Sequence, residues 1–88
     1  MIKRSVRLLK ALGDETRFKI VLFLLSGRKS VTEITAQVKK AQPTVSLQLK
    51  LLELSEVVQS ERAGRQVFYK VSDPTIFTVV KALGKDGK

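Results

Sequence analysis

The chain has 88 residues and a formal net charge of +9, from 17 Lys and Arg against 8 Asp and Glu. It contains no Cys and no His, which excludes a disulfide framework, a Cys/His zinc site, a Ser-His-Asp triad and a Cys-His nucleophile pair. A hydrophobic fraction of 43% is too high for a disordered basic tail, so we expect one small folded domain over 1–88 with a polyanionic partner.

The first two segments have the periodicity of helices. Apolar residues recur at helical spacing from Ile2 to Leu12, and basic residues occupy the opposite face. Asp14 is suited to cap a second helix, which is apolar over most of its circumference and therefore belongs at the centre of a bundle. Ser26-Gly27 is expected to end it, because glycine suits the left-handed position after a helix.

Two shorter helices follow, separated by a break at 39–42. Ser30 and Glu33 fit a capping box at the start of the first of them. Pro43 suits the first position of the second, which is expected to run to about Leu54. Two short helices joined by such a turn form a helix-turn-helix. The residues expected on its core side are Val31, Ile34, Val38, Val45, Leu49 and Leu52.

A hairpin and a last helix complete the pattern. β-Branched and aromatic residues dominate 57–61 and 66–71, and Gly64 can supply the positive φ of the basic loop 62–65 between them. Pro74 is placed for the first turn of a last helix, and 84–88 is expected to be a frayed tail. The predicted fold is mainly α with a small β-hairpin wing, in the order helix-helix-helix-helix-strand-strand-helix.

A basic hairpin directly after a helix pair resembles a winged helix-turn-helix, and four segments resemble the ArsR family of transcriptional regulators. These segments are the family's opening, its segment before the turn, its recognition helix and its wing, at Leu12–Val21, Thr32–Ile34, Gln42–Leu52 and Arg62–Val71. The resemblance spans roughly residues 6 to 80. It implies a homodimeric, sequence-specific DNA-binding regulator, commonly a repressor released by an effector.

The chain departs from the family pattern at the metal sites. Metal-sensing members carry a Cys pair where Ser30 and Thr32 stand here, or His and Asp pairs in the last helix, which has no His in this chain. No spacing of Asp and Glu supports a hard-cation site either. We therefore expect no metal and no cofactor, and the residues identify no effector. Leu54-Ser55-Glu56 replaces the family's Ala-Gly turn, which we expect to affect local geometry more than function.

The helix from Pro43 is expected to read bases, because a recognition helix presents its N-terminal residues to the major groove. Gln42 can pair with adenine, and Thr44 or Ser46 can bond to a base or a phosphate. Leu47 either packs on a thymine methyl or covers a neighbouring element or partner subunit, and Gln48 lies closer to the buried side, where it can set the register. The expected DNA contacts of this helix are Gln42, Pro43, Thr44, Ser46, Leu47, Gln48 and Lys50.

The basic residues around this helix are expected to contact phosphates, which position a protein without specifying sequence. The alternative for any single lysine is a solvated side chain without a partner. Wing side chains can also reach the adjacent minor groove. The expected contacts in the turn and wing are Lys39, Lys40, Arg62, Arg65 and Gln66.

A dimer is expected, because one recognition helix makes only a few base contacts of about 1–3 kcal/mol each, whereas regulatory specificity needs about 4–10 kcal/mol. An isologous pair would place two recognition helices about 34 Å apart, on an inverted repeat. The apolar stripes of the first and last helices are the expected interface, through Ile2, Val6, Leu9, Ile76, Val79, Val80 and Leu83.

Other classes of protein remain as alternatives. A non-specific architectural DNA-binding protein would use the same fold and charge without needing Gln42 or Ser46, and a protein-interaction module would use the wing. An enzyme has the least support, because no carboxylate pair, nucleophile-base pair or phosphate-cradling loop is evident. The longest apolar run, Ile20–Leu25, is far below the ~20 residues of a membrane span, and the first residues lack the features of a signal peptide. We expect a cytoplasmic protein that binds double-stranded DNA and no membrane.

Overall fold

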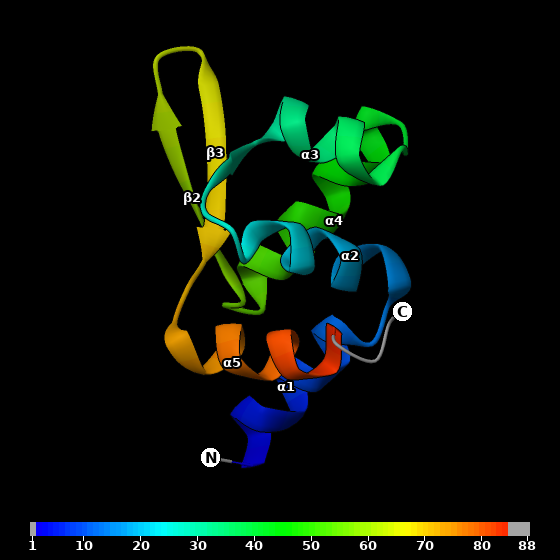
Figure 1. The fold of residues 1–88 in the computed structure, drawn as a ribbon, viewed down its shortest axis with the longest axis vertical. Coiled ribbons are helices and arrows are strands. Elements are labelled where there is room, and N and C mark those ends of the chain that lie inside the picture. The colour runs from blue at the N-terminus through cyan, green and yellow to red at the C-terminus, as the bar shows by residue number, and fades with distance from the viewer. Residues whose placement is uncertain (1, 85–88) are drawn as a thin grey trace.

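The computed structural model describes residues 2–84, which form five helices and a three-stranded sheet (Figure 1). The elements are α1 Ile2–Leu12, α2 Glu15–Leu24, β1 Lys29–Ser30, α3 Val31–Val38, α4 Gln42–Leu54, β2 Val58–Ala63, β3 Gln66–Val71 and α5 Pro74–Gly84. This order confirms the predicted one with a single addition, β1, which pairs antiparallel with β3 at Lys29–Tyr69 and Ser30–Phe68. The strand order in the sheet is β1-β3-β2.

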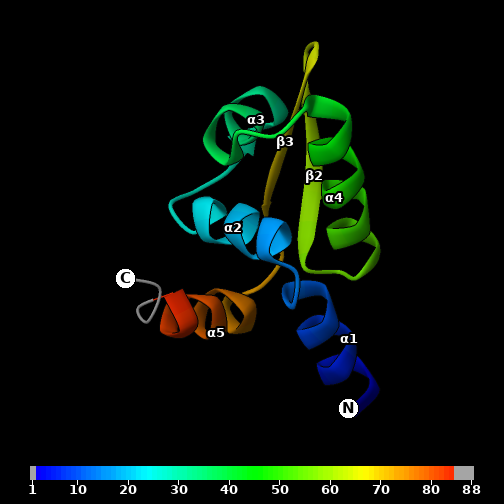
Figure 2. The same ribbon diagram turned by 90° about the vertical axis from the view of Figure 1, so that its right-hand side faces the viewer.

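The helix α2 lies at the centre, as its apolar circumference predicts, and packs against the other four helices and β3. Figure 2 shows the tip of the β2–β3 hairpin and the N-terminal end of α4 at one end of the molecule, with α1 and α5 at the other. The core is one cluster that every helix enters. It consists of Ala11, Leu12, Ile20, Val21, Leu24, Ile34, Val45, Leu49, Leu52, Val57, Val58, Tyr69, Ile76 and Val80.

The predicted caps fix where α2 and α3 begin. The Asp14 carboxylate accepts from the backbone N–H of Arg17 at 3.0 Å. At α3, the Glu33 N–H donates to Ser30 Oγ at 3.0 Å and the Ser30 N–H donates to Glu33 Oε1 at 2.8 Å, which confirms the capping box. Free N–H groups at a helix start are costly when unpaired, so these side chains define the boundaries that place α3 before the turn.

Two turns use left-handed residues that are not glycine. Lys39 ends α3 with φ 59°, and Glu56 follows α4 with φ 64°. The Val57 N–H donates to the Leu52 carbonyl and the Glu56 N–H to the Glu53 carbonyl, both at 3.0 Å, which is the Schellman arrangement. Replacement of the family's glycine at this turn thus leaves the helix end intact and places a side chain where glycine is usually favoured.

The hairpin is tighter than the predicted four-residue loop. Ala63 pairs with Gln66, which leaves Gly64 and Arg65 as a two-residue loop with a positive φ of 64° at Gly64. A positive φ at the first loop residue matches the right-handed twist of the flanking strands. Arg62 therefore lies on β2 rather than in the loop, and Arg65 lies at the tip.

The last helix corrects two predictions. Ile76 and Val80 are 2% and 0% exposed in the single chain, so they belong to its core and not to a dimer surface. The helix also includes Gly84, where a Cβ would meet Leu22 Cδ2 at 2.6 Å, so a larger residue at this close approach to α2 would require the Leu22 side chain to shift. The rest of the predicted tail, 85–88, lies outside the described residues. Within 2–84, none of the helices has the length and apolar character needed to cross a membrane.

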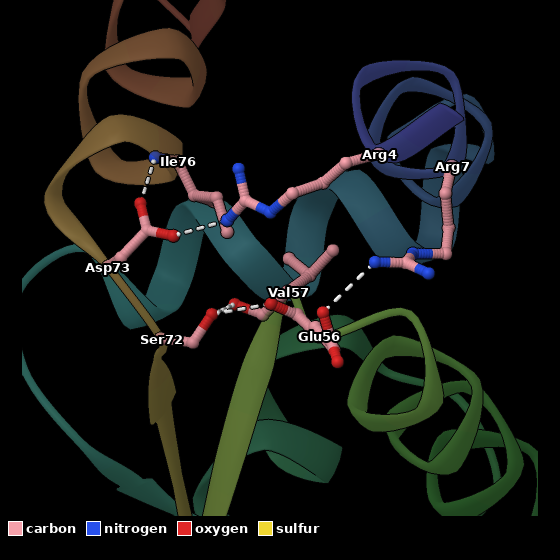
Figure 3. Close-up of polar contacts among 7 residues, drawn as sticks. All are labelled: Arg4, Arg7, Glu56, Val57, Ser72, Asp73 and Ile76. Carbon is pink, nitrogen blue, oxygen red and sulfur yellow. Dashed lines mark hydrogen bonds and ion pairs between the residues drawn. The ribbon is translucent and has the colours of Figure 1, made fainter. Parts of the chain in front are cut away.

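The carboxylate of Asp73 caps α5 and makes folding stability sensitive to acid. It accepts from the Ile76 N–H at 3.1 Å and from Arg4 Nη2 at 2.9 Å (Figure 3), and these bonds, the backbone one foremost, hold the pKa of Asp73 below its ordinary value. A lowered pKa in the folded state adds stability above the unfolded pKa of about 4, and this stability is lost as the pH falls through the folded value.

We therefore expect the urea midpoint to fall as the pH is lowered below about 4. Asn is as good a helix cap as Asp but does not titrate, so Asp73→Asn is expected to show a smaller loss over the same range. The measurement is urea unfolding followed by circular dichroism at neutral and acid pH. Equal losses in the two chains would contradict the assignment of this acid sensitivity to Asp73.

Candidate nucleic-acid interface

The helix α4 separates a buried face from an exposed one, as its spacing predicts. Val45, Leu49 and Leu52 are fully buried, and the exposed residues on the rest of its surface include Gln42, Pro43, Thr44, Ser46, Leu47 and Lys50. Leu47 is 57% exposed, so it does not cover another element of this chain. Contact with a thymine methyl or with a partner subunit stays a prediction for Leu47.

A hollow of about 400 Å³ brings α4 and the wing together. Five residues predicted independently as DNA contacts line it, three from α4 and two from the hairpin: Gln42, Ser46, Lys50, Arg65 and Gln66. Thr32, in the first turn of α3, lies in the same hollow. It was not predicted from the sequence as a DNA contact, although its exposed position between the capping residues Ser30 and Glu33 could have indicated one. The fold thus brings Thr32 and Gln66, which are 34 positions apart in the sequence, to the same hollow.

Gln48 has a different environment from the other predicted contacts. It is half-buried, and its Oε1 accepts from Arg17 Nη1 at 2.9 Å. Arg17 also donates from Nε to the Ala11 carbonyl at 2.7 Å and from Nη2 to the Lys10 carbonyl at 3.5 Å. Arg17 therefore ties the C-terminal end of α1 to the middle of α4, which favours the register role for Gln48. The sequence did not indicate this link, because the partners are 31 positions apart.

Ion pairs compensate only some of the described cations. All seven described carboxylates have a partner: Asp14, Glu33 and Asp73 cap helices, Glu53 accepts from Ser60, and Glu15, Glu56 and Glu61 pair with Lys19, Arg7 and Arg28. The cations predicted to contact DNA make no ion pair with any of these carboxylates: Lys39, Lys40, Lys50, Arg62 and Arg65. The uncompensated positive charge near α4 and the wing is what phosphate groups require.

The start of α4 offers backbone donors beside these cations. Its N-cap, Ala41, provides no side-chain hydrogen bond, and Pro43 in the first turn has no N–H of its own. The N–H groups of Gln42 and Thr44 are therefore not capped by a side chain at the cap position. An uncapped helix start next to Lys39 and Lys40 suits a DNA phosphate, which such N–H groups bind readily.

The base of the wing is held by aromatic residues. Tyr69 is 9% exposed, and burial, with the nearby Glu53 carboxylate, raises the pKa of its hydroxyl. The Arg28 guanidinium lies 4.3 Å from the centre of the Phe68 ring and pairs with Glu61 Oε1 at 2.9 Å, so it joins both hairpin strands to the loop before β1. The side of Phe68 that Arg28 covers is not open to a base, and Phe68 supports the wing.

Metal coordination has no visible basis in the described part of the chain. No group of three or more Asp, Glu, His or Cys side chains within 2–84 is arranged to hold a metal ion. Ser30, at the start of the family's Cys-x-Cys position, is occupied as the cap of α3, and Thr32 lies exposed.

A family model described as "Bacterial regulatory protein, arsR family" matches residues 14–60, more than half of the chain. The match begins at the cap of α2 and ends within β2, so it contains the whole α3–α4 pair. The biofilm growth-associated repressor of Xylella fastidiosa (strain Temecula1) is 37% identical over 76 residues, which cover 86% of this chain and 67% of that repressor. The chain thus spans about two thirds of the length of this relative.

Solved structures agree with the predicted fold. HlyU from Vibrio cholerae superposes with a TM-score of 0.90 at 28% identity, over 94% of this chain and 90% of that one. The homodimeric winged helix-turn-helix DNA-binding domain of Mb0332 from Mycobacterium bovis, a possible ArsR-family transcriptional regulator, superposes with a TM-score of 0.88 at 21% identity, over 98% and 80%. These likenesses confirm the predicted winged helix-turn-helix fold.

Proposed function

The chain belongs to the arsR family of bacterial regulatory proteins, and on this premise we propose that it is a homodimeric repressor that binds an inverted-repeat operator. As a member it is a DNA-binding transcriptional regulator and not an enzyme. We place it in the cytoplasm, where it reaches its DNA. The proposal includes the homodimer, the operator and a mechanism that does not use the family's Cys and His metal sites.

One observation carries the proposal. Gln42, Ser46 and Lys50 share a hollow with Arg65 and Gln66, and the cations around that hollow have no described acidic partner. Amides and hydroxyls read base edges, whereas guanidinium and ammonium groups bind phosphates. The recognition helix and the wing therefore supply both kinds of contact on one surface.

The geometry suggests how DNA is engaged. The N-terminal end of α4 enters the major groove, where the Gln42 amide pairs with adenine and Ser46 bonds to a base or a phosphate. Figure 2 shows the hairpin tip extending beyond the N-terminal end of α4. From the two-residue loop at this tip, Arg65 reaches the adjacent minor groove or its phosphates. Lys39 and Lys40 bind phosphates beside the uncapped start of α4.

Exposed apolar residues at the opposite end support a dimer. The side chains that remain exposed from the predicted interface are Ile2, Val6, Leu9, Val79 and Leu83, which are between 39% and 80% exposed. A hollow of about 230 Å³ between α1 and α5 contains Leu8, Leu9 and Val79. An isologous pairing of these surfaces removes them from water and leaves both α4 helices free for DNA.

Selection from a pool of random duplexes tests the operator. The dimer is expected to enrich a short inverted repeat whose half-sites lie about one helical turn apart. If no repeat were enriched and all duplexes were bound with the same affinity, the proposal of a specific repressor would be contradicted. Such a result would identify an architectural DNA-binding protein instead.

The substitution Lys39→Gly tests a phosphate contact without disturbing the fold. Glycine adopts the left-handed conformation of Lys39 without a Cβ penalty, so the stability is expected to change by less than about 1 kcal/mol. Each phosphate contact contributes about 0.9 to the slope of log K against log salt. A dimer loses two such contacts when Lys39 is replaced in both subunits, so the magnitude of the slope is expected to fall by roughly 2. Fluorescence anisotropy over a salt series measures it, with Lys19→Gln on α2 as the control. An unchanged slope would remove Lys39 from the interface.

A further inference from the structure

Arg17 forms a polar bridge between the helix expected to form the dimer and the helix expected to read DNA. Its backbone is fixed at the start of α2, where its N–H donates to the Asp14 carboxylate at 3.0 Å. Its guanidinium donates from Nε to the Ala11 carbonyl at 2.7 Å, from Nη2 to the Lys10 carbonyl at 3.5 Å and from Nη1 to Gln48 Oε1 at 2.9 Å. Because a guanidinium is planar and rigid, these bonds together favour one orientation of α4 relative to the end of α1.

A second polar connection between α1 and the end of α4 is exposed. Arg7 pairs with Glu56, in the turn after α4, through side chains that are 47% and 66% exposed (Figure 3). Exposed ion pairs contribute little, whereas Arg17 and Gln48 are both half-buried. The helix α1 itself packs most extensively on α2 rather than on α4. The Arg17 bridge is therefore the stronger of the two polar links from α1 to α4.

The environment of Gln48 differs from that of the residues expected to read bases. Gln42 and Ser46 line the hollow shared with the wing, and Gln48 is absent from that lining. A glutamine that pairs with adenine uses both its carbonyl oxygen and its amide nitrogen, and the oxygen of Gln48 is bonded to Arg17. The contacts of Gln48 therefore favour a role inside the protein.

On the premise of the proposed dimer and operator, we propose that Gln48 is a positioning residue that determines which half-site separation the dimer accepts, and that it contacts no base. Val45, Leu49 and Leu52 hold α4 in the core, but apolar burial is non-directional. The bond from Arg17 supplies a direction, because it fixes α4 relative to α1. In a twofold dimer the bridge occurs in both subunits, so a change in its angle moves both α4 helices.

Distances between spin labels test the bridge without DNA. The chain has no Cys, so one introduced Cys gives a single label site in each subunit. Lys50→Cys places the label on the exposed face of α4, and Lys10→Cys places it on α1. Double electron–electron resonance then gives the distribution of distances between the two labels of a dimer.

We expect Gln48→Met, which removes the acceptor at nearly the same size, to broaden the α4 distribution at least about 1.5-fold, because α4 then samples a wider range of orientations. The α1 distribution is expected to stay as in the parent, because the dimer contacts are retained. Gln48→Glu keeps an oxygen for Arg17 and is expected to restore the narrow α4 distribution. The matched control, Gln59→Met at an exposed position of β2, is expected to change neither distribution. Circular dichroism verifies that each variant is folded.

Operator binding gives the functional readout. The selected operator is compared with versions that carry one base pair more or one fewer between the half-sites, a change of about 3.4 Å in their separation. The parent and Gln48→Glu are expected to lose at least about tenfold in affinity on these versions, and Gln48→Met less than about threefold, because its α4 helices adapt to the altered separation. Each comparison is made within one variant, so the effect of the charge that Gln48→Glu adds cancels.

Two results would overturn the proposal. If the α4 distribution in Gln48→Met were as narrow as in the parent, core packing alone would orient α4. If Gln48→Met lost affinity equally at every separation and changed the preferred base at one position, Gln48 would be a base contact.

Failure of the proposed function gives different results. Labels without a measurable distance in the parent would contradict the dimer, and the proposal with it. Selection without any enriched repeat would contradict the operator alone, and the label distances would still show whether Gln48 orients α4.

Discussion

Replacing Gln42 and Ser46 together by Ala is expected to weaken operator binding at least about 100-fold and to leave affinity for random duplex nearly unchanged. Each base contact contributes about 1–3 kcal/mol of discrimination, and the dimer presents both residues twice. Non-specific binding depends instead on phosphate contacts, which this double variant retains. Both side chains are exposed on α4, so the fold has no need of them.

The measurement is competition of labelled operator against unlabelled random duplex, at one stated salt concentration. A control with the same chemical changes is Gln59→Ala with Ser26→Ala, at exposed positions on β2 and after α2. The control is expected to bind the operator as the parent does. Equal weakening on operator and random DNA would show that Gln42 and Ser46 contact phosphates only, and the reading role of α4 would be lost.

Arg17→Ala is expected to lower the free energy of unfolding by about 3 kcal/mol, a large effect for a half-buried polar residue. The variant loses the bonds from Nε to the Ala11 carbonyl and from Nη1 to Gln48, and the bond of a charged donor contributes about 1.5–3 kcal/mol. It also leaves the carbonyls at the C-terminal end of α1 without a side-chain donor. In a domain of this size the thermal midpoint is expected to fall by about 12–24 °C.

Urea unfolding followed by circular dichroism measures this loss. Arg17→Lys retains the charge but lacks the planar fork that reaches α1 and α4 together, so it is expected to recover less than half of the stability. Lys19→Ala, which breaks only the exposed pair with Glu15, is expected to cost less than about 1 kcal/mol. A loss of under 1 kcal/mol in Arg17→Ala would mean that this residue does not join α1 to α4.

The sequence was sufficient for features that depend on neighbours along the chain. Helical periodicity and capping residues placed α1 to α5, because the spacing of apolar residues and the pairing of Ser30 with Glu33 are local. The strand β1 was not predictable in the same way. Its two residues carry no periodicity of their own and become a strand only by pairing with β3.

Features that depend on partners far apart in the sequence were harder to predict. Along α5 the apolar residues cover a wide arc, so the stripe alone could not tell that Ile76 and Val80 turn inward while Val79 and Leu83 stay exposed. The composition gave the net charge but did not show which cations would form ion pairs. Arg4 and Arg7 are paired with Asp73 and Glu56, whereas the cations around α4 have no described acidic partner, and this distinction follows from folding.

The central claim is that two α4 helices, held by one dimer, read two half-sites at a fixed separation on one face of the duplex. The most direct measurement compares the selected operator with a version carrying about five extra base pairs, half a helical turn, between its half-sites. The claim predicts that the affinity falls to that of a duplex with a single half-site, because the second site then faces away from the dimer. Equal affinity for the two duplexes would contradict it.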